Sequence, residues 1–280
     1  MNILPSGRGA RSNTSGRYET FVTESIDDGW SSDDDSAPVL RTTLSEETAR
    51  TIITRNNSPD IGFDRSINPY RGCEHGCIYC YARPAHAYMG LSAGIDFESK
   101  LFYKPQAATL LRNELNAARY RCRPIHIGGN TDPYQPVEKQ TRVTRAVLEV
   151  LQRYNHPLSI ISKSALIARD ADILGEMGRK NLAVACVSIT TLDRKLARAM
   201  EPRAATPTKR LETISRLADA GCPVSVGFAP VIPGLNDHEL ESVLEAAAKA
   251  GATQAMYVTL RLPLEIKDLF QEWLADARPE

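Results

Sequence analysis

The sequence predicts an α/β protein whose core is an open, partial (β/α)6 barrel of the TIM type, and two observations support this fold class. From residue 66 onward, short apolar runs rich in β-branched residues alternate with longer amphipathic segments, which is typical of β/α units around a parallel sheet. Six such units can be counted, too few for a closed eight-stranded barrel. Functional side chains of such a barrel are expected at the carboxyl ends of its strands.

The expected elements follow this alternation along the chain. Strands are predicted at residues 66–70, 124–128, 158–162, 183–190, 224–229 and 254–260, and helices at 138–153, 170–180, 208–220, 236–250 and 264–277. Local signals mark several helix ends. Thr206 before Pro207 is typical of an N-cap, Asn236 is a second candidate N-cap, and Gly221 and Gly251 stand where helices usually end.

The chain divides by composition into two parts. Residues 1–45 are rich in Gly, Ser, Arg and Asp and have few apolar residues, so we expect an irregular N-terminal extension there. Residues 46–280 are expected to form the barrel core, since a chain of 280 residues is long enough for one large domain.

Charge and composition limit the classes of function that this protein can have. The chain has 34 basic and 34 acidic residues, so no overall field draws it to nucleic acid or to a membrane surface. It has neither a signal-peptide pattern nor an apolar run of the roughly 18 residues that a membrane span needs. Three of its six cysteines are clustered and three are scattered, which is not a disulfide framework. We expect a reduced, cytoplasmic protein without a membrane partner.

The clustered cysteines form the strongest motif. Cys73, Cys77 and Cys80 follow the pattern C-x3-C-x2-C, with no fourth cysteine nearby. Three cysteines on a four-iron cluster leave one iron open to an external chelating group. A structural zinc site usually has a fourth Cys or His. His75 or His86 could supply it, so a zinc-stabilised binding module remains an alternative, although His75 is too close to its flanking cysteines for an unstrained tetrahedron.

This spacing, with Tyr79 as the aromatic residue before the third cysteine, resembles the signature of the radical S-adenosylmethionine (SAM) superfamily. The resemblance implies a [4Fe-4S] cluster on Cys73, Cys77 and Cys80, and SAM bound through its amino and carboxylate groups to the open iron, with Tyr79 beside the adenine. It also implies an enzyme in which the reduced cluster cleaves SAM to methionine and a 5′-deoxyadenosyl radical that abstracts hydrogen from the substrate. An electron donor such as flavodoxin or ferredoxin is then required.

The segment after the second expected strand resembles the superfamily's Gly-Gly-Glu-like contact to the methionine amino group. It reads Gly128, Gly129, Asn130, Thr131 and Asp132. Asn130 stands where the family has a carboxylate, so the contact falls to backbone carbonyls, Thr131 or Asp132. A plain turn from strand to loop is the alternative reading of the paired glycines.

Three further strand ends carry candidate SAM contacts. Lys163 is suited to the carboxylate of SAM or to a substrate anion, with a solvated loop lysine as the alternative. Ser188 and Thr190 share one strand face and could reach the ribose, or else lie on the surface. Ile232 and Gly234 belong to a segment that partly resembles the superfamily's adenine-side G-x-I-x-G-x-x-E motif.

The wider sequence resembles the spore photoproduct lyase-like branch, related to DNA repair photolyases, over residues 63–73, 130–138 and 188–193 and at Glu201-Pro-Arg. The resemblance implies an enzyme, lyase- or transferase-like, with an unassigned reaction and an unknown substrate for which nucleic acid is the leading class. Members of this branch tend to run further past the last helix, so the resemblance implies a further C-terminal segment that would cover the site.

The hydrogen donor and the use of SAM stay open at this level. Spore photoproduct lyase has a donor cysteine near the end of its second strand, where this sequence has Gly129, Asn130 and Thr131. Cys186 shares a face with Ser188 and is a candidate donor from another strand, with a small buried core residue as the alternative. An iron-sulfur electron-transfer protein or cluster carrier that does not use SAM is the remaining alternative function.

Overall fold

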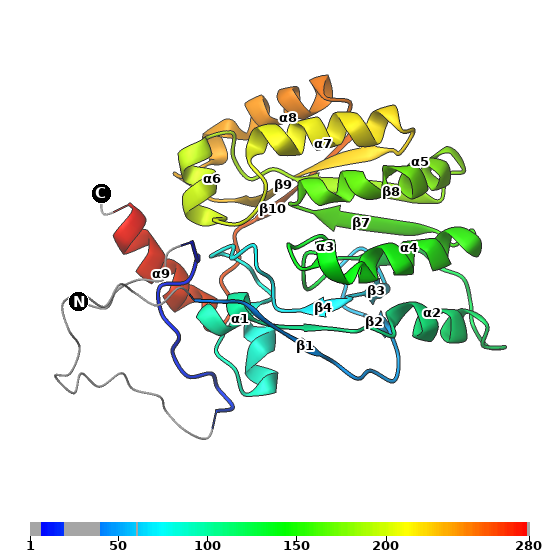
Figure 1. Ribbon diagram of the computed structural model, residues 1–280. Coiled ribbons are helices and arrows are strands. Elements are labelled where there is room, and N and C mark those ends of the chain that lie inside the picture. The colour runs from blue at the N-terminus through cyan, green and yellow to red at the C-terminus, as the bar shows by residue number, and fades with distance from the viewer. Residues whose placement is uncertain (1–6, 20–39, 60, 279–280) are drawn as a thin grey trace.

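The computed structural model describes residues 7–19, 40–59 and 61–278, and it confirms the α/β fold (Figure 1). The main sheet has seven strands in the order β10-β9-β8-β7-β6-β3-β2. Its strands are β2 (Ile53–Arg55), β3 (Arg65–Ile67), β6 (Ile125–Ile127), β7 (Leu158–Ser162), β8 (Ala183–Ser188), β9 (Val224–Val231) and β10 (Gln254–Thr259). All pairs from β3 to β10 are parallel, and β2 adds an antiparallel edge. Six parallel strands in an open sheet confirm the predicted partial barrel.

A second, three-stranded sheet was not predicted. It has the order β1-β5-β4 and consists of β1 (Thr43–Glu46), β4 (Tyr70–Arg71) and β5 (Lys100–Tyr103). The first predicted strand, 66–70, is therefore wrong as a single element, because β3 ends at Ile67 and β4 begins at Tyr70 in the other sheet. Pro69 lies between them and lacks the amide hydrogen that a continuing strand would need.

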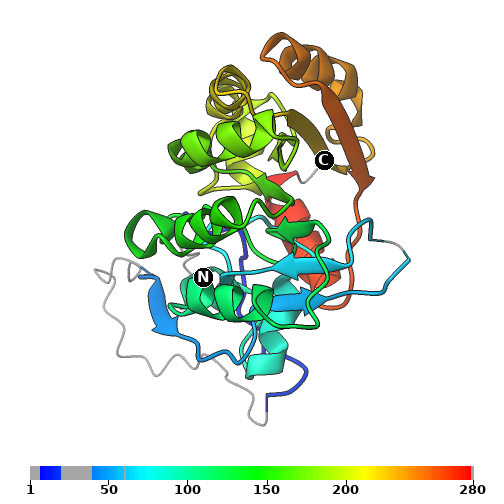
Figure 2. The ribbon, with the colours of Figure 1, turned by 90° about the vertical axis from the view of Figure 1, so that its right-hand side faces the viewer.

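The helices lie mainly along one side of the strands. They are α1 (Ile95–Ser99), α2 (Ala107–Leu115), α3 (Glu138–Thr141), α4 (Val143–Arg153), α5 (Ala171–Arg179), α6 (Arg194–Met200), α7 (Pro207–Asp219), α8 (Leu240–Lys249) and α9 (Ile266–Ala277). Figure 2 shows the helices coloured from teal to orange as an arc outside the strands. Shorter 3-10 turns run over Arg83–Met89, Ala165–Asp170 and Asp237–Glu239. Among the described residues, no helix combines the length and apolar character that crossing a membrane requires.

The helix-end predictions have mixed outcomes. Thr206 accepts a hydrogen bond from the amide of Lys209 at 3.4 Å and α7 begins at Pro207, which confirms this N-cap. Gly221 and Gly251 have positive φ angles of 88° and 106°, as expected beyond helix ends. Asn236 stands at the N-cap position of the 3-10 turn Asp237–Glu239, but its side chain makes no capping hydrogen bond there. The predicted strand 158–162 is confirmed in full, and most other predicted limits shift by one to four residues.

The predicted helix at 138–153 is in fact two helices. Arg142 has a left-handed φ of 52° and separates α3 from α4. The buried carboxylate of Glu138 accepts hydrogen bonds from the amides of Thr144 at 3.0 Å and Arg145 at 3.3 Å. These amides lie in the first turn of α4, where intrahelical partners are missing. A side chain on α3 therefore satisfies the start of α4, which periodicity alone could not reveal.

Alternation along the strands separates two faces of the main sheet. Ile125, Ile160 and Ala185 belong to the large apolar cluster shared with the helices. Because neighbouring strand residues point to opposite faces, His126 and Cys186 lie on the face turned away from this cluster, which we call the inner face. The inner face is the one on which a partial barrel carries its site.

A second apolar cluster lies at the end of the molecule where α6 and α9 meet. Phe270 and Trp273 of α9 pack there with Leu196 and Met200 of α6, and Ile78 belongs to the same cluster. In Figure 1, α6 and α9 lie at the left, the end toward which β7 points. This end carries the carboxyl ends of the parallel strands.

Residues 7–19 of the predicted extension form no helix or strand, and residues 1–6 and 20–39 lie outside the described part of the chain. The extension predicted over residues 1–45 is wrong at its end, because β1 begins at Thr43 and pairs with β5. Arg8 and Ala10 are nevertheless buried, with 5% and 1% of their surfaces exposed. The amides of Gly9 and Ala10 donate to the carboxylate of Glu98 at 2.9 and 2.8 Å. The segment thus contributes to the packing around α1.

Candidate active site

The three clustered cysteines lie on one loop directly after β4. All three are free thiols, Cys73 and Cys77 are buried, and Cys80 is half-buried. Burial raises the pKa of each thiol above its usual value. Thiolates are the form that binds metal, so a metal bound here would displace thiol protons. The loop therefore presents three largely buried sulfur donors.

Main-chain hydrogen bonds hold this cysteine loop from several sides. The amide of Cys73 donates to the carbonyl of Phe97 at 2.9 Å, and the amide of Ile78 donates to the carbonyl of Met200 at 3.0 Å. Arg83 donates from Nε to the carbonyl of Cys77 at 2.9 Å. The loop is thus held by Phe97 of α1, by Met200 of α6 and by the side chain of Arg83.

Behind the loop lies a fully buried ion pair. Arg83 and Glu98 are 2.5 Å apart, and neither side chain is exposed. Gly76 lies against this pair with a φ of 68°, and a Cβ atom there would be 2.6 Å from Oε2 of Glu98. A Cβ atom on Gly9 would lie 1.8 Å from the carbonyl oxygen of Gly76. Only glycine fits at either position, so the N-terminal segment and the cysteine loop are in direct backbone contact.

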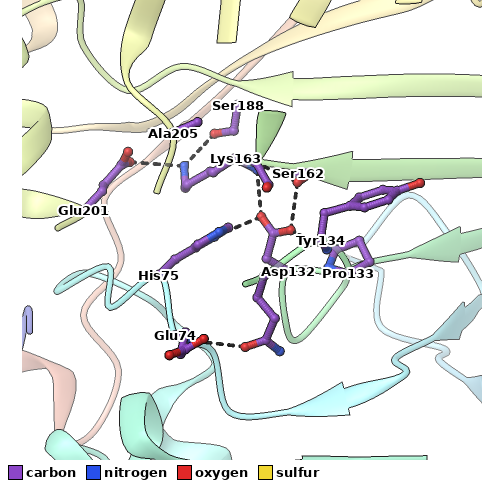
Figure 3. A network of polar contacts seen from close by, with 12 residues as sticks. Glu74, His75, Asp132, Pro133, Tyr134, Ser162, Lys163, Ser188, Glu201 and Ala205 are labelled. Carbon is purple, nitrogen blue, oxygen red and sulfur yellow. Dashed lines mark hydrogen bonds and ion pairs between the residues drawn. The ribbon is translucent and has the colours of Figure 1, made fainter. Parts of the chain in front are cut away.

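Asp132, after β6, links three segments of the site (Figure 3). Its Oδ1 accepts from Ser162 Oγ at 2.7 Å, and its Oδ2 accepts from the amide of Lys163 at 2.7 Å. His75 Nδ1 lies 3.2 Å from Oδ2, at ion-pair distance but without hydrogen-bond geometry. Burial raises the pKa of Asp132, but His75 and the donors from Lys163 and Ser162 outweigh it and lower the pKa below its usual value.

Glu201, just after α6, is the most connected group of the site. It is buried and accepts hydrogen bonds from the hydroxyl of Tyr79, from Thr190 Oγ1 at 2.7 Å and from the guanidinium of Arg210. Lys163 Nζ lies 3.4 Å from Oε1 (Figure 3). Burial raises the pKa of Glu201, but the positive charges of Arg210 and Lys163 lower it more, so the pKa falls below its usual value.

Lys163 places a cation among hydroxyl groups and one aromatic ring. Its Nζ donates to Ser188 Oγ at 2.6 Å, to Thr190 Oγ1 at 3.3 Å and to the carbonyl of Ala229 at 3.3 Å. The same nitrogen lies 5.5 Å from the centre of the Tyr79 ring, within the range of a cation–π contact. The ends of β7, β8 and β9 thus meet the cysteine loop around one ammonium group.

The family comparison agrees with this geometry. The model described as "Radical SAM superfamily" matches residues 67–247, which include the cysteine loop and the ends of β6 to β9. The chain belongs to the radical SAM superfamily. The similar proteins below add detail about its relatives.

Two relatives by sequence are both named as uncharacterized proteins. Rv2578c of Mycobacterium tuberculosis is 35% identical over 226 residues, covering 80% of this chain and 66% of its own length. MJ0683 of Methanocaldococcus jannaschii is 27% identical over 173 residues, covering 62% of each chain. The chain thus spans slightly less than two thirds of the length of these relatives.

Two solved structures of spore photoproduct lyase show the same fold. A mutant enzyme has a TM-score of 0.62 at 15% identity, and a complex with dinucleoside spore photoproduct has 0.61 at 15% identity. Each match covers 86% of this chain and 68% of the other. At this identity the likeness concerns architecture alone.

The candidate site brings together four of the residues singled out from the sequence. Tyr79, Lys163, Ser188 and Thr190 are joined by the contacts described above. Ser188 and Thr190 are 3% and 0% exposed, so they are not surface residues. A cation and two hydroxyls beside an aromatic ring can receive a carboxylate, a ribose and an adenine.

The residues that follow β6, from Gly128 to Asp132, mainly contact other protein groups. Gly128 has a φ of 99°, and a Cβ atom there would lie 2.8 Å from the carbonyl oxygen of Ile161. The carbonyl of Gly129 accepts from the hydroxyl of Tyr81. The exposed Asn130 has its amide bonded to Asn68 Oδ1 at 2.8 Å.

Thr131 is buried and donates to the carbonyl of Tyr70 at 3.4 Å. Both oxygens of Asp132 accept hydrogen bonds from β7 or its following residue, as described above. In the segment 128–132, the side chains of Thr131 and Asp132 are therefore bonded to protein groups, whereas Asn130 is held through its main-chain amide.

The residues after β9 lie at the opposite wall. Ile232 is buried, and its amide donates to Oδ1 of Asn236 at 2.6 Å, while Nδ2 of Asn236 donates to the carbonyl of Thr190 at 2.7 Å. Gly234 is exposed, with a φ of 75°, and its amide donates to Asp237 at 3.0 Å. Asn236 thus ties the ends of β8 and β9 together rather than capping a helix.

Cys186 lies deeper on the inner face of β8. It is 9% exposed, and burial raises its pKa, so its sulfur carries a proton at neutral pH. A Cβ atom on Gly227 of the adjacent strand would lie 3.2 Å from its sulfur, so the neighbouring glycine leaves room beside the thiol.

Sequence reasoning missed the central role of Glu201 and Arg210. Glu201 was visible only as the first residue of the Glu-Pro-Arg motif, and Arg210 lies in an amphipathic helix where an arginine usually faces water. Both are almost fully buried, and each satisfies the charge of the other. Neither residue, taken by itself in the sequence, indicates that the two side chains form a buried ion pair.

The residues present fit a cluster with an open iron better than a single metal ion. Within the part of the chain that the structure describes, no three His, Cys, Asp or Glu side chains are arranged to hold a metal ion. His75 Nδ1 lies 3.2 Å from Oδ2 of Asp132 without a hydrogen bond, and Nε2 of His86 lies 3.0 Å from the carbonyl oxygen of Lys100. Three sulfurs spread along one loop match the donor set of a larger cluster.

Proposed function

We propose that this protein is a radical SAM enzyme that holds a [4Fe-4S] cluster on Cys73, Cys77 and Cys80 and binds SAM between the cysteine loop and the ends of β7 to β9. One observation carries the proposal: the loop's Tyr79 shares a single hydrogen-bonded network with Lys163, Thr190 and Glu201. A carrier of clusters alone would need no such polar pocket beside its cysteines.

The cluster, when bound and reduced, supplies the electron that cleaves SAM into methionine and a 5′-deoxyadenosyl radical. The protein's residues bind SAM and orient it. Lys163 is assigned to the carboxylate of SAM, Ser188 and Thr190 to its ribose, and Tyr79 to one side of the adenine. The segment 128–132 and the residues Ile232 and Gly234 are assigned to the amino group and the adenine, through backbone atoms where the side chains are already engaged.

For the substrate we propose a nucleobase-containing molecule, with repair or modification of nucleic acid as the working class. The inner face carries Phe63 stacked on His126, with ring centres 4.2 Å apart and planes 16° from parallel. Burial lowers the pKa of His126 to about 4, so this ring is neutral at physiological pH. Stacked, uncharged rings are suited to a flat base. Cys186, protonated on the same face, is the candidate hydrogen donor.

The test is anaerobic reconstitution with iron and sulfide, followed by dithionite and SAM and assay of 5′-deoxyadenosine. We expect product from the wild type and from Cys222→Ala, whose cysteine lies in the core cluster, and none from Cys77→Ala. Iron and sulfide content should fall in Cys77→Ala alone. A cluster of full iron content that leaves SAM intact would favour the cluster carrier, and tight zinc in place of iron would favour the binding module.

The proposal also requires an electron donor such as flavodoxin or ferredoxin and a reducing compartment, for which we propose the cytoplasm. The free thiols among the described residues agree with reduced surroundings. The identity of the donor can be approached from the surface around the cysteine loop.

A further inference from the structure

One face of α6 carries three positive charges in a short stretch. Arg194, Lys195 and Arg198 are exposed, and none of them forms an ion pair with any residue that the structure describes. In contrast, the exposed Lys180 and Lys249 each pair with a glutamate on their own helix. The α6 face is therefore a compact patch of uncompensated charge.

The opposite face of α6 packs directly on the cysteine loop. Leu196 and Met200 are buried in the same apolar cluster as Cys77 and Ile78. The carbonyl of Met200 accepts the hydrogen bond from the amide of Ile78 at 3.0 Å. A single helix thus separates the basic patch from the loop that carries the three cysteines.

Neighbouring acidic groups do not neutralise the patch. Helix α9 contacts α6 through Trp273, whose Nε1 donates to the carbonyl of Ala199 at 3.1 Å. On α9, Asp276 pairs with Arg11 at 2.7 Å, and Glu272 accepts from Ser12 at 2.7 Å. These two carboxylates are held by the N-terminal segment and leave the α6 cations unpaired.

A hollow of about 570 Å³ adjoins the patch between α6 and the start of α7. Arg194 and Arg198 line it from α6, Thr206 lines it from the start of α7, and the buried Glu201 between the two helices also lines it. The hollow is large enough for acidic side chains of a partner to enter and meet both guanidinium groups. Guanidinium groups favour bidentate contacts with carboxylates.

We propose that the exposed face of α6 is the docking surface for an acidic one-electron donor of the flavodoxin class; this inference rests on the proposed function. In the step concerned, the donor's reduced flavin loses one electron and becomes the semiquinone, and the cluster gains that electron and passes from the 2+ to the 1+ state. The α6 cations bind the donor's carboxylates and hold its flavin edge close to the cysteine loop.

Position favours a redox partner over nucleic acid. The proposed substrate must reach the inner face of the sheet, where His126 and Cys186 lie, whereas the exposed face of α6 points away from the cysteine loop and from Tyr79. An electron donor needs only short distance to the cysteines, which α6 provides.

The test compares two electron sources in the reconstituted protein. In Lys195→Glu/Arg198→Glu, SAM cleavage driven by reduced flavodoxin at low salt should fall at least about tenfold, while dithionite-driven cleavage stays at the wild-type rate. The control Lys180→Glu/Lys249→Glu makes the same change in net charge on α5 and α8 and should leave both rates unchanged. Flavodoxin binding to the cluster-free protein, measured by fluorescence titration, should weaken in the α6 variant and with rising salt.

Each outcome has a definite meaning. Equal losses in the two double variants would show a general charge effect and overturn the α6 surface. Unchanged flavodoxin binding in the α6 variant would also overturn it, as would loss of oligonucleotide binding with intact reduction by flavodoxin, which would assign the patch to nucleic acid. Absence of SAM cleavage with dithionite in the wild type would instead refute the proposed function.

Discussion

Lys163 Nζ lies 3.4 Å from Oε1 of Glu201. The ammonium group that follows β7 is therefore paired with a carboxylate that follows α6. Glu201 also accepts from Tyr79 and Arg210. One buried carboxylate therefore sets the positions of a residue on the cysteine loop and of the ammonium group at the strand ends. The predictions below test this arrangement and its surroundings.

Glu201→Gln should destabilise the protein by about 3 kcal/mol, since it leaves the buried Arg210 without a counter-charge. The measurement is urea unfolding of the cluster-free protein at pH 7. Glu212→Gln is the matched control, because its pair with Lys209 is exposed and should contribute less than about 0.5 kcal/mol. Equal midpoints for the two variants would mean that the buried pair adds nothing to stability.

Lys163→Met should weaken SAM binding about tenfold or more while the fold persists, since Arg210 still compensates Glu201. Equilibrium dialysis of the reconstituted protein with SAM measures this, with Lys180→Met as an exposed-lysine control. Unchanged SAM affinity with loss of substrate turnover would assign Lys163 to a substrate anion instead.

Gly9→Ala should lower the free energy of unfolding by roughly 1–3 kcal/mol, because the added methyl group would lie 1.8 Å from the carbonyl oxygen of Gly76. Because Gly76 lies between two of the cysteines, iron retained after reconstitution and gel filtration should also fall. At Gly62 an added Cβ meets nothing within 4 Å, so Gly62→Ala is the control. Normal iron retention in Gly9→Ala would show that the loop does not depend on the N-terminal segment.

His126 should make stability fall in mild acid. Burial lowers its pKa to about 4 from 6.5, so the folded state resists a proton that the unfolded state accepts. Its contribution is therefore complete above pH 6.5 and is lost progressively as pH falls to 4, by up to about 3 kcal/mol at 1.36 kcal/mol per pKa unit. The difference in unfolding free energy between wild type and His126→Gln should shrink from pH 7.5 to 4.5. A difference that is constant with pH would contradict a buried neutral imidazole.

The sequence alone was sufficient for the class of fold and for the cysteine motif. The alternation of strands and helices determined six parallel strands, because each unit carries its own periodicity and its own end signals, as at Thr206 and Gly221. The spacing of Cys73, Cys77 and Cys80 is likewise local, since one loop carries all three.

Only the tertiary structure decided which charged residues are buried and what they contact. Glu201 and Arg210 come together with Lys163 from three separate segments, and Gly9 reaches Gly76 across 67 positions of the sequence. The second sheet also depends on distant segments, because its strands β1, β4 and β5 come from separate parts of the sequence. The local sequence pattern indicates whether a segment forms a helix or a strand. Burial and ion pairing depend on which distant segment packs against it. The contacts of this site could therefore be identified only from the tertiary structure.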